Sequence, residues 1–127
     1  MAILNSFEVT IAVDEEACPE YADDETEDTP TSKSTYIEAT PGAQFKIQLE
    51  IMPGFEFGKA NYLRWEIFLD GNSIMKPLCF DWAYRGEGYW QDSRGSLREK
   101  QGDVWVERKF YFRHARIREC FYWVEYS

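Results

Sequence analysis

Two segments of the chain alternate apolar and polar residues, and this alternation constrains the fold more than any other feature of the sequence. Residues 6–13 (SFEVTIAV) and 45–51 (FKIQLEI) place an apolar side chain at nearly every second position. A period of two is typical of a β-strand with one buried face, whereas an amphipathic helix needs a period near 3.6. No segment of the sequence sustains that helical period. The alternation therefore predicts an all-β fold.

Turn signals divide the remaining chain into further short strands. Strands are expected at residues 36–39, 62–69, 73–80, 104–112 and 121–126, and residues 55–61 and 81–95 are expected as loops. Asp70-Gly71-Asn72 predicts a tight hairpin, and Pro77 predicts a break or an edge position in the strand that follows. Such spacing favours a single domain (residues 1–127) with an antiparallel, jelly-roll-like β-sandwich of about eight strands.

An acidic segment follows the first strand. Residues 14–28 contain nine acidic side chains and no lysine or arginine. Few apolar residues occur up to position 35, so burial cannot offset the entropy lost on ordering this stretch. We expect residues 14–35 to form a long exposed acidic loop that stays solvated, binds a cation weakly or docks a basic partner. The acids expected to contact a partner are Asp23, Asp24, Glu25, Glu27 and Asp28.

Aromatic residues are unusually abundant. Five Trp, eight Tyr and nine Phe are more rings than a single core of this size is expected to hold. Exposed aromatic clusters often mark binding sites. The expected loop at residues 81–95 either packs on the sandwich, binds a protein, or stacks on the faces of sugar rings. Its candidate binding residues are Trp82, Tyr84, Tyr89 and Trp90.

The charge of the chain limits its partners. A formal net charge of -9 repels the phosphates of nucleic acids and anionic lipid heads, so neither is expected as a partner. A basic protein fits this charge. Residues 94–118, in contrast, carry eight basic and three acidic side chains. This polarity is either compensated within one molecule or used between molecules in head-to-tail self-association.

No catalytic or metal-binding motif is recognisable, so we expect a protein that is not an enzyme and has no cofactor. His114 is the only histidine, and no nucleophile-elbow sequence accompanies it. Cys18, Cys79 and Cys120 have neither the paired spacing of a zinc site nor that of a disulfide framework. Cys79 and Cys120 are expected to fill the core.

The same features predict an intracellular protein, either cytoplasmic or nuclear. The three cysteines do not form an even framework of the kind found in secreted proteins. The N-terminal residues lack the basic region of a secretory signal. No apolar run approaches the roughly 20 residues that a membrane span needs.

Four stretches in this order resemble a fungal family of domains of unknown function, the 7918 type. They are residues 7–14 (FEVTIAVD), 36–51 (YIEATPGAQFKIQLEI), 67–74 (IFLDGNSI) and 109–117 (KFYFRHARI). The resemblance implies a jelly-roll-like β-sandwich and transfers no catalytic residues. The chain departs from the family pattern at Glu15, where a glycine is usual, and in its longer acidic insertion.

These observations predict a non-enzymatic module for protein interaction or assembly, which uses the acidic loop and the aromatic loop. One alternative is a carbohydrate-binding module that uses the aromatic loop. Another is an acidic chaperone for basic proteins such as histones, whose binding would weaken steeply with salt.

Overall fold

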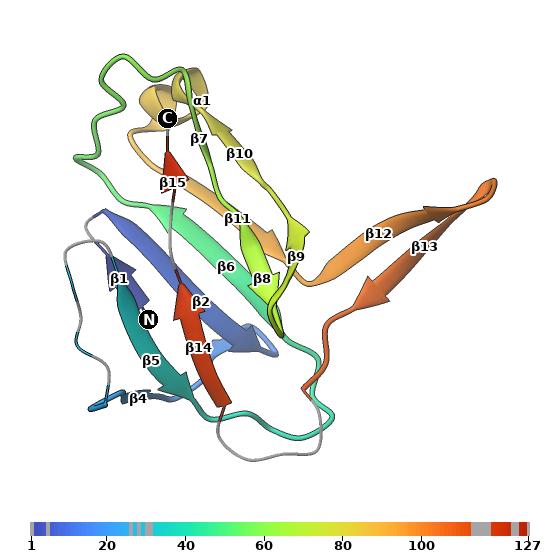
Figure 1. Cartoon of the computed structure of the whole chain (residues 1–127). Coiled ribbons are helices and arrows are strands. Elements are labelled where there is room, and N and C mark those ends of the chain that lie inside the picture. Colours follow the sequence, from blue (N-terminus) through green and yellow to red (C-terminus); the bar gives the residue numbers. More distant parts are fainter. Residues whose placement is uncertain are drawn as a thin grey trace.

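The fold is mostly β-structure, and every strand pair is antiparallel (Figure 1). The computed structural model describes residues 2–4, 6–25, 27, 29, 32–112, 118–122 and 125–126, and it describes side chains only between residues 6 and 112. This part of the chain has one helix, α1 (Asp81–Glu87), whose seven residues are too few to cross a membrane.

The largest sheet has the strand order β1 (Ala2–Leu4), β2 (Phe7–Val13), β6 (Lys46–Ile51) and β11 (Trp90–Arg94), and β3 (Glu16–Ala17) also pairs with β2. A second sheet has the order β14 (Arg118–Tyr122), β5 (Lys33–Ile37) and β4 (Glu20–Ala22). A third has the order β10 (Leu78–Phe80), β7 (Tyr62–Arg64) and β15 (Glu125–Tyr126). Two hairpins complete the fold: β8 (Ile67–Leu69) with β9 (Asn72–Met75), and β12 (Ser96–Gln101) with β13 (Val104–Lys109).

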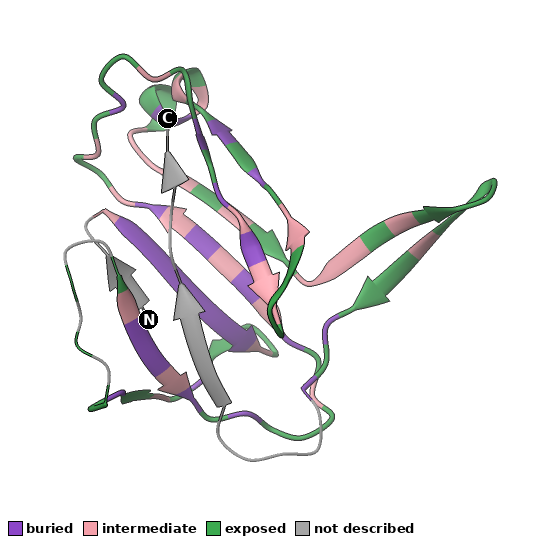
Figure 2. Cartoon of the chain, viewed as in Figure 1, coloured by how far each residue is buried: buried purple, intermediate pink, exposed green. Residues whose placement is uncertain are grey.

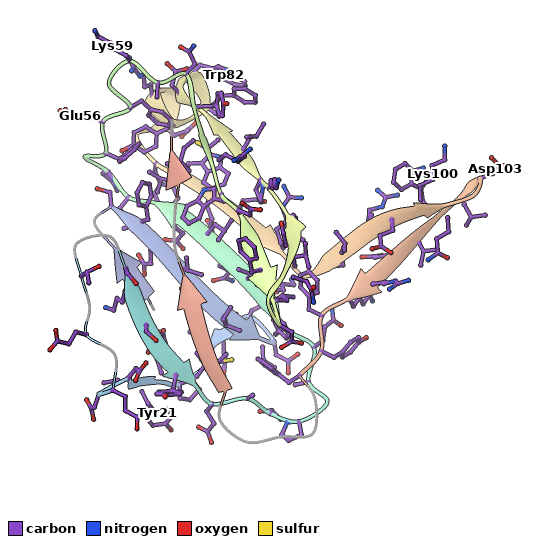
Figure 3. The ribbon with its side chains drawn as sticks, viewed as in Figure 1. Tyr21, Glu56, Lys59, Trp82, Lys100 and Asp103 are labelled. Carbon is purple, nitrogen blue, oxygen red and sulfur yellow. The ribbon has the colours of Figure 1, made fainter. Side chains whose placement is uncertain are left out.

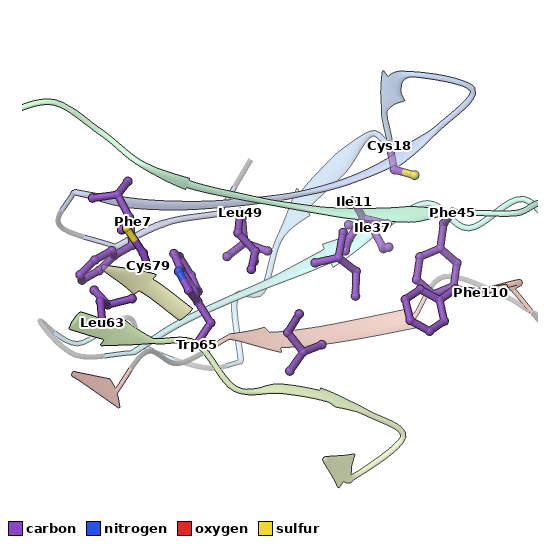
Figure 4. Close-up of a cluster of buried hydrophobic side chains, with 14 of the residues drawn as sticks. Phe7, Ile11, Cys18, Ile37, Phe45, Leu49, Leu63, Trp65, Cys79 and Phe110 are labelled. Carbon is purple, nitrogen blue, oxygen red and sulfur yellow. The ribbon is translucent and has the colours of Figure 1, made fainter. Parts of the chain in front are cut away.

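The core forms on one face of the pair β2–β6. The register places Phe7 opposite Ile51, Val9 opposite Leu49 and Ile11 opposite Ile47, and all six side chains are buried. Ile37 of β5 and Leu63 of β7 belong to the same cluster (Figure 4). Each aliphatic or aromatic side chain buried in this way stabilises the fold by roughly 1.5–3 kcal/mol. The alternation predicted for residues 45–51 is confirmed by this packing.

The prediction that one face of the first strand is solvent-exposed is wrong. Glu8, Thr10 and Ala12 are buried, as are the apolar residues between them (Figure 2). β2 lies inside its sheet between β1 and β6, so its polar side chains are flanked by neighbouring side chains on both sides. β6 is also internal, yet Lys46, Gln48 and Glu50 are only partly buried, so this position alone does not account for the burial of Glu8 and Thr10.

The prediction of a loop at residues 81–95 is also wrong, because this segment contains α1 and β11. A seven-residue helix has two turns, which are too few to display a helical period. Its end is nevertheless encoded in the sequence. Gly88 adopts a left-handed backbone with φ of 67°, and its N–H donates to the Tyr84 carbonyl.

The two phenylalanines of the expected loop at residues 55–61 belong to the core. Phe57 is buried, and Phe55 is partly buried with its ring centroid 5.1 Å from that of Phe57.

In the described part of the chain, fifteen strands replace the roughly eight expected, because irregular residues divide the longer ones. The expected strand at residues 62–69 splits into β7 and β8, and Pro77 separates β9 from β10, as its missing N–H predicts. The Asp70-Gly71 hairpin is confirmed. Val104 is exposed, because β13 extends away from the core.

The pair Glu8–Glu50 makes a testable contribution to stability. The two residues are directly opposite in the β2–β6 register. Burial raises the pKa of Glu8, and the negative charge of Glu50 raises it further. Ionised Glu8 therefore disfavours the folded state. This penalty is absent at low pH, grows as the pH rises from the ordinary glutamate pKa to the raised one, and is complete above it.

We expect Glu8→Gln to increase the free energy of unfolding at pH 7 by roughly 0.2–1 kcal/mol, the usual size of a cross-strand like-charge effect, and to leave it unchanged near pH 3. Urea denaturation at the two pH values measures the difference. Glu50→Gln should have a smaller effect of the same sign, because it removes the neighbouring charge but not the burial of Glu8. Glu56→Gln, at an exposed position, serves as the control. An equal change at both pH values would contradict this explanation.

Candidate interaction surface

The acidic segment is more ordered than a solvated loop. Within residues 14–35 the chain forms β3, β4 and the start of β5. Asp23 is buried, with its carboxylate accepting hydrogen bonds from the Ser34 hydroxyl at 2.8 Å and the Glu25 backbone N–H at 3.1 Å. Asp23 therefore joins β5 to the turn after β4, a structural task that the sequence did not reveal. Asp24, Glu25 and Glu27 are exposed, and Asp28 lies outside the described residues.

The structure does not bring the four predicted aromatic residues together. Trp82 is 72% exposed on α1, whereas Tyr84 is 5% exposed and faces the core. Trp90 is partly buried and stacks on Trp65 with ring centroids 6.3 Å apart. Tyr89 is partly buried, and burial together with a hydrogen bond to Glu50 raises its pKa. Of the four, Trp82 alone presents most of its ring to solvent.

Tyr84 attaches α1 to the core. Its hydroxyl donates to the Met52 carbonyl at 2.9 Å and accepts from the Phe55 backbone N–H at 3.0 Å. Its ring packs against Phe55 and Phe57, with centroids 6.2 and 5.5 Å away. The helix therefore has a fixed orientation, with Tyr84 directed inward and Trp82 outward.

An exposed patch that we call the aromatic surface extends from Trp82 over β7 and β10. It consists of Tyr62 (40% exposed), Leu78 (45%), Phe80 (44%) and Trp82. The ring centroids of Tyr62 and Phe80 are 6.4 Å apart, and those of Phe80 and Trp82 are 6.2 Å apart with planes inclined by 13°. Figure 3 shows Trp82 at the periphery of the molecule. The patch is therefore continuous from β7 to the start of α1.

Strand alternation explains why these side chains face outward. Cys79 is opposite Leu63 in the β10–β7 register, and both are fully buried. Their neighbours therefore point to the other face, where Phe80 is opposite Tyr62 and Leu78 is opposite Arg64. The alternation Leu78-Cys79-Phe80 was present in the sequence. Pro77 obscures this signal, because it limits the alternating stretch to three residues.

The described residues provide no recognisable reaction centre. None of their His, Cys, Asp and Glu side chains form a group of three or more that could hold a metal ion. Asp81 pairs with Arg85 and Asp92 with Arg94, at 3.8 and 2.8 Å. Cys79 is a core residue as predicted, and burial raises its pKa to about 11, so its thiol is unreactive at neutral pH. His114 and the Cys120 side chain lie outside the described residues.

Comparison with known proteins identifies the family. Residues 6–120 match the family described as "Domain of unknown function (DUF7918)". The chain belongs to this family. The resemblance noted in the sequence is thereby confirmed, and the match extends over every element from β2 to β13. No curated protein and no solved structure matches the DUF7918 chain.

The role of Tyr84 can be tested by removing its hydroxyl. Tyr84→Phe leaves the Met52 carbonyl and the Phe55 N–H without their partner in a partly buried site. We expect the free energy of unfolding to fall by about 1–3 kcal/mol, measured by urea denaturation. Tyr111→Phe is the matched control, because Tyr111 is 57% exposed. Equal stability of the two variants would show that the hydroxyl does not hold α1.

Proposed function

We propose that this DUF7918 domain is a non-enzymatic protein-interaction module that binds a partner protein through the aromatic surface. The observation that carries the proposal is the pair of ring contacts that join the exposed Tyr62, Phe80 and Trp82. Leu78 is exposed on the same face of β10 as Phe80. Single exposed apolar residues are normal on soluble proteins, but a continuous patch is typical of a binding site.

The chemistry of the surroundings favours a protein as the partner. Aromatic residues and arginine are enriched where protein interfaces are most buried. Arg64 lies on the same face of the β10–β7 pair as the aromatic surface and is exposed. Arg85 of α1 already pairs with Asp81 at 3.8 Å. The surface is best fitted by a partner that covers the rings with apolar side chains and places an acidic side chain near Arg64.

The proposed scaffold is a jelly-roll-like β-sandwich. Its support is the single core cluster shared by the large sheet and by residues of β5, β7 and β8. Rigid sheets would hold the aromatic surface in one shape, so little entropy would be lost on binding. We also propose that the protein works in a reducing intracellular compartment. Cys18 and Cys79 are both free thiols, which supports this.

Sugar binding is a second candidate, for one specific reason. The rings of Phe80 and Trp82 are exposed and nearly parallel, at 13°. Exposed aromatic faces are also the surfaces on which sugar rings stack. Sugar binding would therefore use the same residues as protein binding. An experiment must distinguish the two functions.

The test compares the tagged wild-type protein with Phe80→Ser/Trp82→Ser in quantitative affinity capture and on a glycan array. We expect capture of the main protein partner to fall roughly tenfold or more, because truncating central aromatic residues of an interface commonly costs over 2 kcal/mol. Tyr111→Ser, at an exposed aromatic position outside the surface, should capture the partner normally.

Stability should change by less than about 0.5 kcal/mol in Tyr111→Ser. Phe80→Ser/Trp82→Ser also removes the ring contacts of a half-buried Phe80, so circular dichroism and urea denaturation check that this variant stays folded. Glycan binding that disappears in Phe80→Ser/Trp82→Ser, without loss of a protein partner, would favour the sugar candidate. Identical capture by wild type and both variants, with a silent glycan array, would refute both.

A further inference from the structure

A second surface lies on the β12–β13 hairpin (residues 96–109), which we call the arm. The arm projects away from the body of the molecule (Figure 1), and most of its residues are exposed or partly exposed (Figure 2). Among the described residues, neither strand pairs with any other strand. Six residues of β-strand span about 20 Å, enough to reach a neighbouring molecule.

The base of the arm is firmly attached to the core. Phe110 and Phe112 follow β13 and stack on Phe45, with ring centroids 5.6 and 4.5 Å away. Backbone hydrogen bonds join Phe45 N–H to the Phe110 carbonyl at 2.9 Å and Phe112 N–H to the Ala43 carbonyl at 3.0 Å. The arm therefore begins at a rigid point, although an isolated two-stranded hairpin has little stability of its own.

The register gives the arm two chemically different faces. Cross-strand partners share a face, so Ser96 and Lys109, Arg98 and Glu107, and Lys100 and Trp105 all lie on one face. The opposite face carries Leu97, Val106 and Val104, together with the Arg108–Glu99 ion pair at 3.4 Å. We call the first of these the basic face, because it has three cations and one carboxylate.

Among the described residues, the cations of the basic face have no acidic partner. The Glu107 carboxylate accepts a hydrogen bond from the Ser96 hydroxyl at 2.8 Å. Within the described part of the chain, no carboxylate lies at ion-pair distance from Arg98, Lys100 or Lys109. Arg98 instead lies over the ring of Trp105, 5.8 Å from its centroid, and that ring is 60% exposed. The face thus offers positive charge next to an exposed aromatic ring.

The complementary charge occurs in the same chain. Asp24, Glu25 and Glu27 are exposed, and in the part of the chain that the structure describes no lysine or arginine pairs with them. They follow β4, far from the arm within one molecule. Figure 3 shows Tyr21 of β4 and Lys100 of the arm at opposite sides of the structure. One copy cannot bring the two together in this conformation.

We propose that the basic face of the arm binds the acidic segment of a second copy of this chain, so that copies associate head to tail. The contact joins two different surfaces of the chain. Such a heterologous contact builds closed rings or open chains of copies. Two molecules of charge -9 repel at long range. At about 0.15 M salt this repulsion is screened beyond roughly 8 Å, whereas the direct contact is screened less. The contact is separate from the aromatic surface, and either can fail without the other.

A charge-swap experiment tests the proposal. One variant reverses the arm (Arg98→Glu/Lys100→Glu), and another reverses the acidic segment (Asp24→Lys/Glu25→Lys/Glu27→Lys). Lys59→Glu, an exposed reversal in a remote loop, is the control. Light scattering of concentrated protein at 0.15 M and 0.5 M salt reports the mass, and circular dichroism reports folding.

We expect the wild type and Lys59→Glu to exceed the monomer mass of 15.0 kDa at 0.15 M salt and to dissociate toward it at 0.5 M. Each reversed variant alone should associate roughly tenfold or more weakly, because like charges then meet. An equimolar mixture of the two reversed variants should associate again, since the arm of each then fits the segment of the other.

A wild-type mass of 15.0 kDa at every concentration would overturn the proposal, as would reversed variants that associate like the wild type. A basic face with an exposed aromatic ring also suits single-stranded nucleic acid. Titration of a fluorescent single-stranded oligonucleotide tests this alternative. Binding that depends on Arg98 and Lys100, without self-association, would assign the arm to nucleic acid and refute the proposal.

Discussion

The antiparallel pairing of β2 with β6 is the interaction on which the rest of the molecule depends. Six consecutive residue pairs align Phe7, Val9 and Ile11 with apolar residues of β6. A shift of one residue would turn every one of these side chains to the opposite face, so the core itself enforces the register. β1 and β3 then add to β2, and β11 adds to β6. The large sheet is therefore built outward from this pair.

Both candidate surfaces are connected to this pair by a few buried residues. Tyr84 ties α1 to the Met52 carbonyl, one residue after β6 ends, and this orients Trp82. Phe45 lies one residue before β6 begins and holds the base of the arm through Phe110 and Phe112. The two ends of β6 thus position two surfaces of different chemistry. Loss of order at either end would disturb one surface and leave the other intact.

The sequence predicted the parts of the fold that follow from local patterns. The alternation in residues 45–51 and the Asp70-Gly71 turn needed no knowledge of distant residues, and both are confirmed. The burial of Glu8 could not be predicted, because it depends on how segments far apart in the sequence pack together. The same holds for Asp23, whose burial depends on its hydrogen bond with Ser34 eleven residues away. Long-range pairing decides such positions, and one sequence does not display it.

For the candidate site, the sequence predicted Trp82 and missed its neighbours. Proximity along the chain suggested Tyr84, Tyr89 and Trp90, but alternation across paired strands selects Tyr62 and Phe80 instead. Binding surfaces on sheets are assembled across strands, so the useful unit for prediction is the cross-strand pair and not the contiguous segment.

The same logic separates residues that the core requires from those that it leaves exposed. Cys79 and Leu63 are fully buried and hold β10 against β7, whereas Phe80 and Leu78 in the same strand remain open to solvent. These two side chains are not part of the core cluster. Trp105 lies on a strand that no described strand of the body pairs with, and its ring is not part of that cluster either. The proposed contacts with other molecules would give these rings a role that the packing of the chain itself does not.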